Sequence, residues 1–324
     1  MNRTKAYFTL LIALLLTMLC SCGRNAKIMD EAERIVEQSP DSSLALLSTV
    51  DRYSLSKSDR ARYGLLFTMA QDKSGIDVDM DTLIRQSYIY YKGEPETKYY
   101  GLSQYYMGKY YFLNDSTTQC EECFRNVINN AKERGDIDLQ CLALEKLSRS
   151  IVLGNTKMSI AYARQGLALY KTSKTRNLSN VVSYTLNLAF SFAMDNQKDS
   201  AFAYLRQAKG MLNSKIDKEV IADVYHIYSG VYNYFNETDS ALFYSRKALE
   251  EMHSDKFLIS YAFCLQKSDS LEAAEKILRD CVKRCGNQQK YLVYMDICKM
   301  SGRRLSDKQH SDDIDSLDKY TEMY

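Results

Sequence analysis

The sequence has very little proline, glycine and tryptophan. Of its 324 residues, 2 are proline, 13 are glycine and none is tryptophan. Proline and glycine are the residues that interrupt or weaken an α-helix, so a chain with so few of them is expected to be helical along most of its length. Hydrophobic residues make up 45% and charged residues 26%, which is typical of a folded protein with a core. We therefore predict an all-α fold.

The chain also lacks an excess of either charge. Lys and Arg number 43 and Asp and Glu number 41, and without Arg3 and Lys5 near the N-terminus both counts are 41. A neutral chain with no basic run has no strong electrostatic attraction for nucleic acid. The sequence predicts no nucleic-acid partner, and it leaves the oligomeric state undetermined.

Residues suited to catalysis or metal binding are scarce. The three histidines, His226, His253 and His310, are too scattered to favour a catalytic triad or a histidine-based metal site. P-loop, HExxH, GxSxG and EF-hand patterns are absent from the sequence. The prediction is a protein that is not an enzyme, with no cofactor and no metal.

Two of the cysteines, Cys120 and Cys123, have the CxxC spacing of redox and zinc sites. No second CxxC follows, and both residues lie on a predicted helix. We interpret them as small buried residues. A disulfide or metal site is left open at one further group: Cys264, Cys281, Cys285 and Cys298.

The N-terminus carries a targeting pattern. Residues 1–21 have a basic start and then an apolar run from Tyr7 to Leu19, which is short for a membrane span and typical of a signal peptide. The run ends in Leu19-Cys20-Ser21-Cys22, which resembles the lipobox of bacterial lipoproteins. The resemblance implies cleavage before Cys22, lipidation of Cys22 (acyl chains such as palmitate) and membrane attachment in a Gram-negative cell envelope. It implies the outer membrane, on its periplasmic or its surface face; an uncleaved signal anchor is the alternative.

The chain contains internal repeats. "KDSAFAYLRQA" at 198–208 and "TDSALFYSRKA" at 238–248 share six residues at an offset of forty, and weaker copies begin at 118 and 157. Each copy follows a longer segment in which apolar residues recur every three or four positions, as on one face of a helix. These longer segments are 96–113, 137–153, 178–194 and 217–235. Each unit is thus predicted to be two antiparallel helices joined by a short polar link.

The units resemble tetratricopeptide repeats (TPR). In that motif small residues sit where two helices cross, because helices approach to about 8–10 Å only when side chains at the crossing are small. Large residues then fill the space next to the following hairpin. The matching positions are Gly108, Tyr111, Cys120, Phe124 and Val127; Ala189, Phe192, Ala201, Leu205 and Ala208; Ser229, Tyr232, Ala241, Ser245 and Ala248; and Ala262, Leu265, Ala274, Leu278 and Cys281.

The resemblance implies a TPR-like solenoid of about seven helix pairs plus a C-terminal helix. It assigns 22–300 to the repeat domain, with 287–300 as one more first helix, and leaves 301–324 as a polar C-terminal helix or tail. The resemblance also implies a partner-binding groove along the first helices of the repeats. By register the predicted groove residues are Tyr105, Lys109, Phe112, Glu145, Arg149, Asp223, His226, Asn233 and Tyr234.

Six tyrosines occur within "YYGLSQYYMGKYY" at 99–111. In the repeat frame this is a first helix, with Gly108 at the crossing and Tyr111 in the aromatic slot of the motif. We interpret most of the run as packing, since a tyrosine ring is large and apolar while its hydroxyl stays in contact with water. Tyr105 is the residue of the run that we assign to the groove.

A short motif, Asp followed by Ser or Thr, recurs where second helices are predicted to begin. One interpretation is helix capping, in which the Asp side chain accepts a hydrogen bond from a free backbone N–H. The pattern also resembles the O-glycosylation acceptor of some bacterial envelope proteins, and the two interpretations are compatible. The candidate acceptors are Thr82, Ser116, Ser200, Ser240 and Ser270; a further copy lies at 315–317.

Two functions remain open at this point. The first is a lipid-anchored envelope scaffold that binds a protein or peptide partner along its groove. The second is a glycan-associated helical lipoprotein of an uptake system. Helical glycan binders of that kind usually carry exposed tryptophans, and the absence of tryptophan favours the first function.

Overall fold

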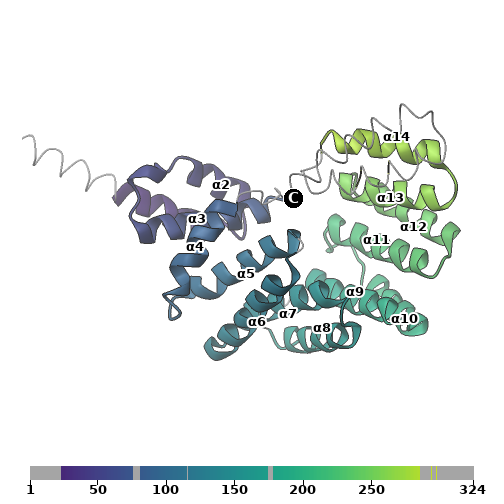
Figure 1. Ribbon diagram of the computed structural model, residues 1–324, viewed down its shortest axis with the longest axis horizontal. Coiled ribbons are helices and arrows are strands. Elements are labelled where there is room, and N and C mark those ends of the chain that lie inside the picture. Colours follow the sequence, from purple (N-terminus) through teal and green to yellow (C-terminus); the bar gives the residue numbers. More distant parts are fainter. Residues whose placement is uncertain are drawn as a thin grey trace, which may run out of the picture. The chain divides into compact units, whose positions relative to one another are not determined.

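The computed structural model describes residues 23–75, 81–114, 116–173, 178–284, 293 and 297, and Figure 1 shows their helices. No strand occurs in these residues, so the predicted all-α fold is confirmed. None of the helices described is both long and apolar enough to cross a membrane. Residues 1–21, Cys22, the copy at 315–317 and the tail 301–324 lie outside the described residues.

The helices of the described residues form seven successive hairpins, in agreement with the prediction of about seven. A helix over 23–35 pairs with α2, and the later helices pair in order, α3 with α4 through α13 with α14. The bounds are α2 (Pro40–Ser48), the short 3₁₀ helix η1 (Arg52–Ser54), α3 (Lys57–Lys73), α4 (Asp81–Lys92), α5 (Lys98–Leu113), α6 (Thr117–Arg134), α7 (Ile137–Ile151), α8 (Thr156–Tyr170), α9 (Leu178–Met194), α10 (Lys198–Gly210), α11 (Lys218–Tyr234), α12 (Thr238–Glu251), α13 (Asp255–Lys267) and α14 (Leu271–Val282).

The chain divides into two compact units, Met1–Ala143 and Leu144–Tyr324, which we describe separately. Within each unit the first helix of one hairpin contacts the first helix of the next. In the first unit α3 contacts α5; in the second unit α9 contacts α11, and α11 contacts α13. The first helices of a unit therefore lie side by side, which is the arrangement that the predicted groove requires.

Three hairpins of the second unit are closed by the same turn. The turn residues Asn196, Asn236 and Asp269 have positive φ values of 58°, 60° and 63°, a left-handed conformation that Asn and Asp tolerate better than most residues. In each turn the following backbone N–H donates back to a carbonyl five residues earlier. These bonds run from Gln197 to Phe192, from Glu237 to Tyr232 and from Ser270 to Leu265, each at 2.9 Å. This Schellman ending fixes where the second helix starts relative to the first.

The turn places the small residues of the motif opposite each other, twelve positions apart in sequence. In these three hairpins the pairs are Ala189 with Ala201, Ser229 with Ala241, and Ala262 with Ala274, and all six residues are 0% exposed. The Ser229 hydroxyl donates to the Ala241 carbonyl at 2.9 Å, so the two helices touch at this level. The predicted role of small residues at the crossings is confirmed, as are the buried positions of Ala208 and Ala248.

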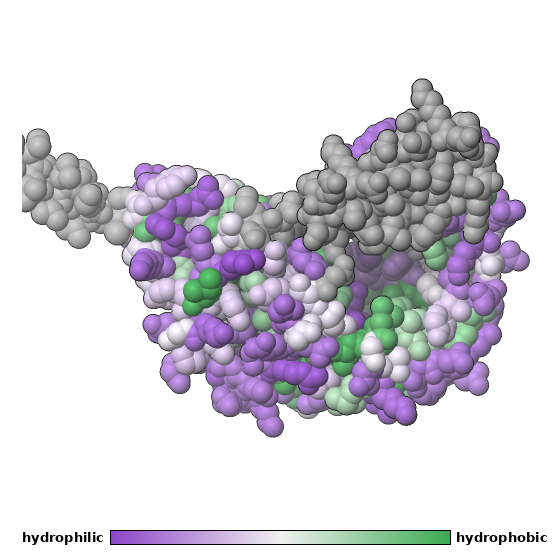
Figure 2. All heavy atoms as spheres, viewed as in Figure 1, coloured by the Kyte–Doolittle hydropathy of each residue, from purple (hydrophilic) through white to green (hydrophobic). Residues whose placement is uncertain are grey.

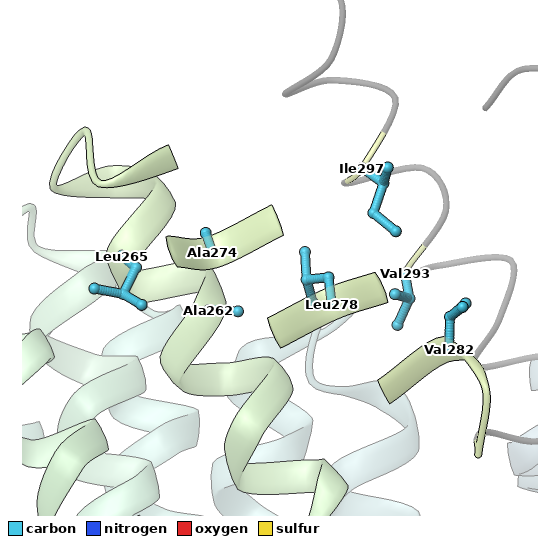
Figure 3. Packing of buried hydrophobic residues seen from close by; sticks show 7 residues of the cluster. All are labelled: Ala262, Leu265, Ala274, Leu278, Val282, Val293 and Ile297. Atoms are coloured by element: carbon cyan, nitrogen blue, oxygen red, sulfur yellow. The ribbon is translucent and has the colours of Figure 1, made fainter. Parts of the chain in front are cut away.

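The last hairpin has its own core, which Figure 3 shows from close by. Ala262 and Leu265 of α13 meet Ala274 and Leu278 of α14 in this cluster. Val293 and Ile297 are helical, lie about one turn apart and are buried against the same cluster. At these two positions the structure agrees with the prediction that 287–300 forms one more first helix.

The capping role predicted for the Asp-Ser/Thr motif is wrong where the structure describes it. The motif does lie at the start of second helices, but Gln197 and Glu237 occupy the cap positions of α10 and α12, and neither forms a side-chain capping bond. Asp199 and Asp239 lie inside the first turn, and Asp269 is the left-handed turn residue. An acid in the first turn acts instead through the helix dipole, which contributes about 0.3–1 kcal/mol.

Two glycines in first helices allow a matched test of the crossing. A Cβ at Gly108 would lie 2.9 Å from the buried ring of Phe124, whereas a Cβ at Gly230 would meet nothing within 4 Å. We expect Gly230→Ala to raise the free energy of unfolding by about 0.5–1 kcal/mol through helix propensity. Gly108→Ala should lower it, because overpacking costs about 1–3 kcal/mol. Urea denaturation followed by circular dichroism measures both; stabilisation by both variants would contradict the close crossing.

Candidate ligand-binding surfaces

The tyrosine-rich helix α5 is mainly a packing element, as predicted. Tyr106 is 4% exposed, and Tyr111 is half-buried. Tyr105, however, is also only 5% exposed, and its ring lies 5.9 Å from that of Phe124 on α6. Our assignment of Tyr105 to an open groove is therefore wrong. The reason is the crossing itself: Tyr105 lies about one turn before Gly108, so it points to the partner helix of its own hairpin.

The other groove residues predicted for the first unit have different surroundings. Lys109 forms an ion pair with Asp72 of α3, so its charge ties two first helices together. Phe112 is 38% exposed and remains available to a partner. Of the three residues predicted in this unit, Phe112 is the one with substantial open surface.

In the second unit, Glu145 of α7 lies in a polar group with its helix neighbours and with α9. Arg149 approaches its carboxylate to 3.6 Å, as does Lys146. Burial by itself raises the pKa of Glu145, but Lys146, Arg149 and the Asn187 amide outweigh it and hold the pKa below its usual value. The Asn187 Nδ2 has no hydrogen bond of normal geometry among the described residues. This amide nitrogen is buried beside Glu145 and offers no open surface to a ligand.

His226 and Asp223 of α11 connect this helix to α13. His226 Nδ1 lies 3.1 Å from the Ser260 hydroxyl, and its ring meets the Phe257 ring edge-on at 5.6 Å. Asp223 forms an ion pair with Lys256. Burial, and then the positive charge of Lys256, lower the pKa of His226 to about 4. His226 is thus neutral at neutral pH and is mainly a link between first helices.

The C-terminal end of α11 combines a buried and an open position. Asn233 is only 7% exposed and donates to Cys264 Sγ at 3.0 Å, so its assignment to an open groove is wrong. Tyr234 is 42% exposed, and Phe263 of α13 is 40% exposed. Phe263 is not among the groove residues predicted from the sequence. Gly230, about one turn before Tyr234 on α11, has open space where a side chain would begin. In Figure 2 hydrophobic atoms gather in a hollow near the region where Figure 1 draws α9 and α11.

We call these side chains the first-helix stripe of the second unit: Glu145, Arg149, Asn187, Asp223, His226, Gly230, Tyr234 and Phe263. Its chemistry is mixed. Arg149 has half of its side chain exposed, and the aromatic rings of Tyr234 and Phe263 are open. Such a surface suits a peptide segment that carries an acidic side chain and apolar side chains.

The cysteines of the described chain are packing residues. Cys120 and Cys123 are 0% and 2% exposed, as predicted, and burial raises the pKa of the Cys123 thiol to about 12. Cys264 and Cys281 are buried thiols as well. No group of metal-ligating side chains occurs among the described residues. Cys285 and Cys298 lie outside the described residues, so a disulfide or metal site at Cys264, Cys281, Cys285 and Cys298 stays a prediction.

The candidate O-glycosylation residues all have some exposed surface. Thr82 and Ser270 are exposed, while Ser116, Ser200 and Ser240 are half-buried at the starts of their helices. Their accessibility is compatible with modification, which stays a prediction.

The sequence matches no protein-family model and no curated protein. The fold places the protein in the structural class of TPR-like helical repeats. Among solved structures, the chain is similar to the quorum sensor NprR in complex with its cognate peptide NprX, with a TM-score of 0.59 and 14% identity over 89% of this chain and 86% of that one. It is similar to a Rap protein complexed with the Competence and Sporulation Factor, with a TM-score of 0.59 and 12% identity over 93% and 98%. It is also similar to a signal-transduction ATPase from Pyrococcus horikoshii that carries a tetratricopeptide repeat sensor, with a TM-score of 0.53 and 12% identity over 91% and 46%.

The lowered pKa of His226 predicts a specific pH dependence of stability. Between the unfolded pKa near 6.5 and the folded value of about 4, the unfolded chain binds a proton that the folded chain does not. Stability from this residue is therefore complete above pH 6.5 and is lost as the pH falls to 4, by at most about 3 kcal/mol. His226→Gln should lose less stability than the wild type between pH 7 and pH 4.5 in urea denaturation. Equal losses in the two proteins would show that His226 titrates normally.

Proposed function

We propose that this protein is a lipid-anchored scaffold of the bacterial envelope that binds an extended peptide segment of a protein partner along the first-helix stripe of its second unit. The observation that carries the proposal is the combination of the half-exposed Arg149 and the two open aromatic rings of Tyr234 and Phe263 on first helices of the second unit. The guanidinium attracts an acidic side chain, and Tyr234 and Phe263 supply apolar contacts.

The frame around the stripe favours a preformed site. Links between first helices, such as His226 with Ser260 and Asp223 with Lys256, hold α11 and α13 in one register. A rigid surface of this kind loses little conformational entropy when it binds, so more of the contact energy appears as affinity. The likeness to NprR, which has been solved with its cognate peptide, agrees with a peptide ligand at the level of the fold.

Membrane attachment is supported by the sequence of the N-terminus. The apolar run before Ser21-Cys22 resembles a lipoprotein signal, and a lipid on Cys22 would hold the repeat domain at a membrane surface. Each buried methylene of an acyl chain contributes about 0.8 kcal/mol of membrane affinity. A scaffold held in this way meets partners that are themselves in the envelope.

The peptide proposal is tested on the full chain in detergent with an array of peptides of varied sequence. The best peptides should bind with an affinity that falls about tenfold or more in Arg149→Glu and in Tyr234→Ala, because each change removes a central contact worth more than about 1.4 kcal/mol. Arg246→Glu is the matched control, since Arg246 is an exposed cation on the second helix α12. The control should bind like the wild type.

Unchanged peptide affinity in Arg149→Glu and Tyr234→Ala would overturn the placement of the site. A chain that binds a glycan array and no peptide would instead favour the alternative of a glycan-associated lipoprotein. Circular dichroism of each variant verifies that the helices remain formed.

The anchor is tested by intact-mass analysis of the protein isolated from the native host. We expect a mature chain that begins at Cys22 and carries the added mass of a lipid, and a Cys22→Ala variant that fails to be processed. A mature chain that begins elsewhere, or an unmodified Cys22, would exclude the lipoprotein assignment while leaving the peptide proposal intact.

A further inference from the structure

A pocket of about 460 Å³ opens between the second helix α10 and the next hairpin, α11 with α12. Its lining residues are Phe202, Arg206, Lys209, Gly210, Tyr228, Tyr232 and Tyr244. Tyr228 and Tyr232 of α11 lie two positions away from His226 and Tyr234, which places them on the opposite face of that helix from the first-helix stripe. The pocket is therefore separate from the surface proposed above.

The tyrosine rings form a stacked wall. The Tyr228 and Tyr244 rings are 4.6 Å apart and inclined by 13°, and the Tyr232 and Tyr244 rings are 5.4 Å apart and inclined by 12°. Phe202 of α10 packs on Tyr232 at 4.7 Å. The wall is rigid and apolar, while the phenol groups at its edge are polar.

All the charged residues of the lining are positive. Arg206 and Lys209 lie one turn apart on α10, and neither forms an ion pair with a carboxylate within the described part of the chain. Lys209 Nζ lies 5.5 Å from the centre of the Tyr244 ring, so the wall holds it beside the pocket. Two cations on one helix face repel each other, and an anion between them relieves that repulsion.

The phenol groups of the wall add neutral hydrogen-bond donors to the two cations. Tyr228, Tyr232 and Tyr244 form no hydrogen bond through their hydroxyls among the described residues. Burial, and then the neighbouring Tyr244, raise the pKa of Tyr228 to about 12, so this phenol keeps its proton at neutral pH. The pocket thus presents an ammonium, a guanidinium and phenol O–H groups, and its side chains include no carboxylate to accept from them.

A comparison of two repeats shows that this pocket is not a necessary part of the fold. One repeat earlier, Tyr204 stacks on Phe192 at 5.3 Å and 12°, which is the geometry of Tyr244 on Tyr232, and Arg164 lies over Phe192 at 5.2 Å. There, however, the positions of Tyr228 and Lys209 are taken by Leu188 and Leu167, which are 1% and 8% exposed. Leucine fills the space in one repeat, whereas tyrosine and lysine line a pocket in the next.

We infer that the pocket formed by α10, α11 and α12 binds a small molecule that joins an oxyanion, a carboxylate or a phosphate, to a flat ring. The two cations and the phenol O–H groups hold the anion, and the ring lies against Phe202 and the tyrosine edges. The volume suits one small ligand, since such sites usually measure about 300–1,000 Å³. The ligand class follows from charge and shape together, because a neutral ring leaves the cations unpaired.

The inference is tested by titration calorimetry of the full chain in detergent with phenyl phosphate and benzoate. At least one of them should bind saturably, with a Kd below about 1 mM. Arg206→Gln and Lys209→Gln should each weaken binding about tenfold or more, since a charge-assisted hydrogen bond contributes about 1.5–3 kcal/mol. The double variant defines the background uptake of ligand into micelles. Whichever of the two probes binds more tightly identifies the oxyanion.

Matched controls separate the contributions. Arg246→Gln changes the equivalent arginine of the following repeat and should bind like the wild type. Tyr244→Phe keeps the stacked ring, removes one hydroxyl and should weaken binding several-fold. Benzyl alcohol and inorganic phosphate, which each carry half of the ligand, should bind at least about tenfold more weakly than phenyl phosphate.

Four results would overturn the inference. The first is that neither ring anion binds saturably, and the second is that the Arg206 and Lys209 variants bind as tightly as the wild type. The third and fourth are that benzyl alcohol or inorganic phosphate binds as tightly as phenyl phosphate. Arg206 and Lys209 are exposed, so their variants are expected to fold, and circular dichroism verifies this. If either variant fails to fold, the affinity of Tyr244→Phe is the deciding measurement. Weaker binding than the wild type supports the site, and equal binding overturns it.

Discussion

The close approach of two helices within each hairpin is the constraint on which the rest of the structure depends. Side chains at the crossing must be small, because an added atom at Gly108 would lie 2.9 Å from the ring of Phe124. The turn must also start the second helix at one fixed residue. A left-handed Asn or Asp and a bond back over five residues do this in three successive hairpins of the second unit. Once both conditions hold, the remaining positions of each repeat are free to differ.

The residues at these remaining positions have different roles on the two faces of the first helices. On the first helices, polar side chains mostly connect one hairpin to the next, as His226 does with Ser260 and Asn233 with Cys264. Buried polar pairs of this kind specify register, because a shifted helix would leave them without partners. On the other face of the first helices, toward the second helices, the aromatic stack recurs in two repeats, while the residues around it change from leucine to tyrosine and lysine. The pocket is thus a variation on a packing arrangement that the preceding repeat forms with leucine.

Charge follows the same division. Lys109 pairs with Asp72, and Lys256 pairs with Asp223, so these cations are used in holding first helices together. Arg206 and Lys209 form no ion pair in the described chain. In a protein with equal numbers of acids and bases after residue 21, an unpaired pair of cations beside a pocket is a local feature and not a consequence of net charge.

The amino-acid sequence by itself determined the helix pairs and their crossings, because small residues at a spacing of twelve and a repeat of about forty are local patterns that recur. It also indicated the packing role of Cys120 and of most tyrosines in α5. It did not determine which residues face open surface. Tyr105 and Asn233 lie at positions that suit a groove, yet each is buried, since exposure depends on what the neighbouring helices bring against that face. Phe263 and the pocket around Tyr244 likewise became visible only when helices from different hairpins were placed side by side, because residues from three helices separated in sequence form one surface only after the chain has folded.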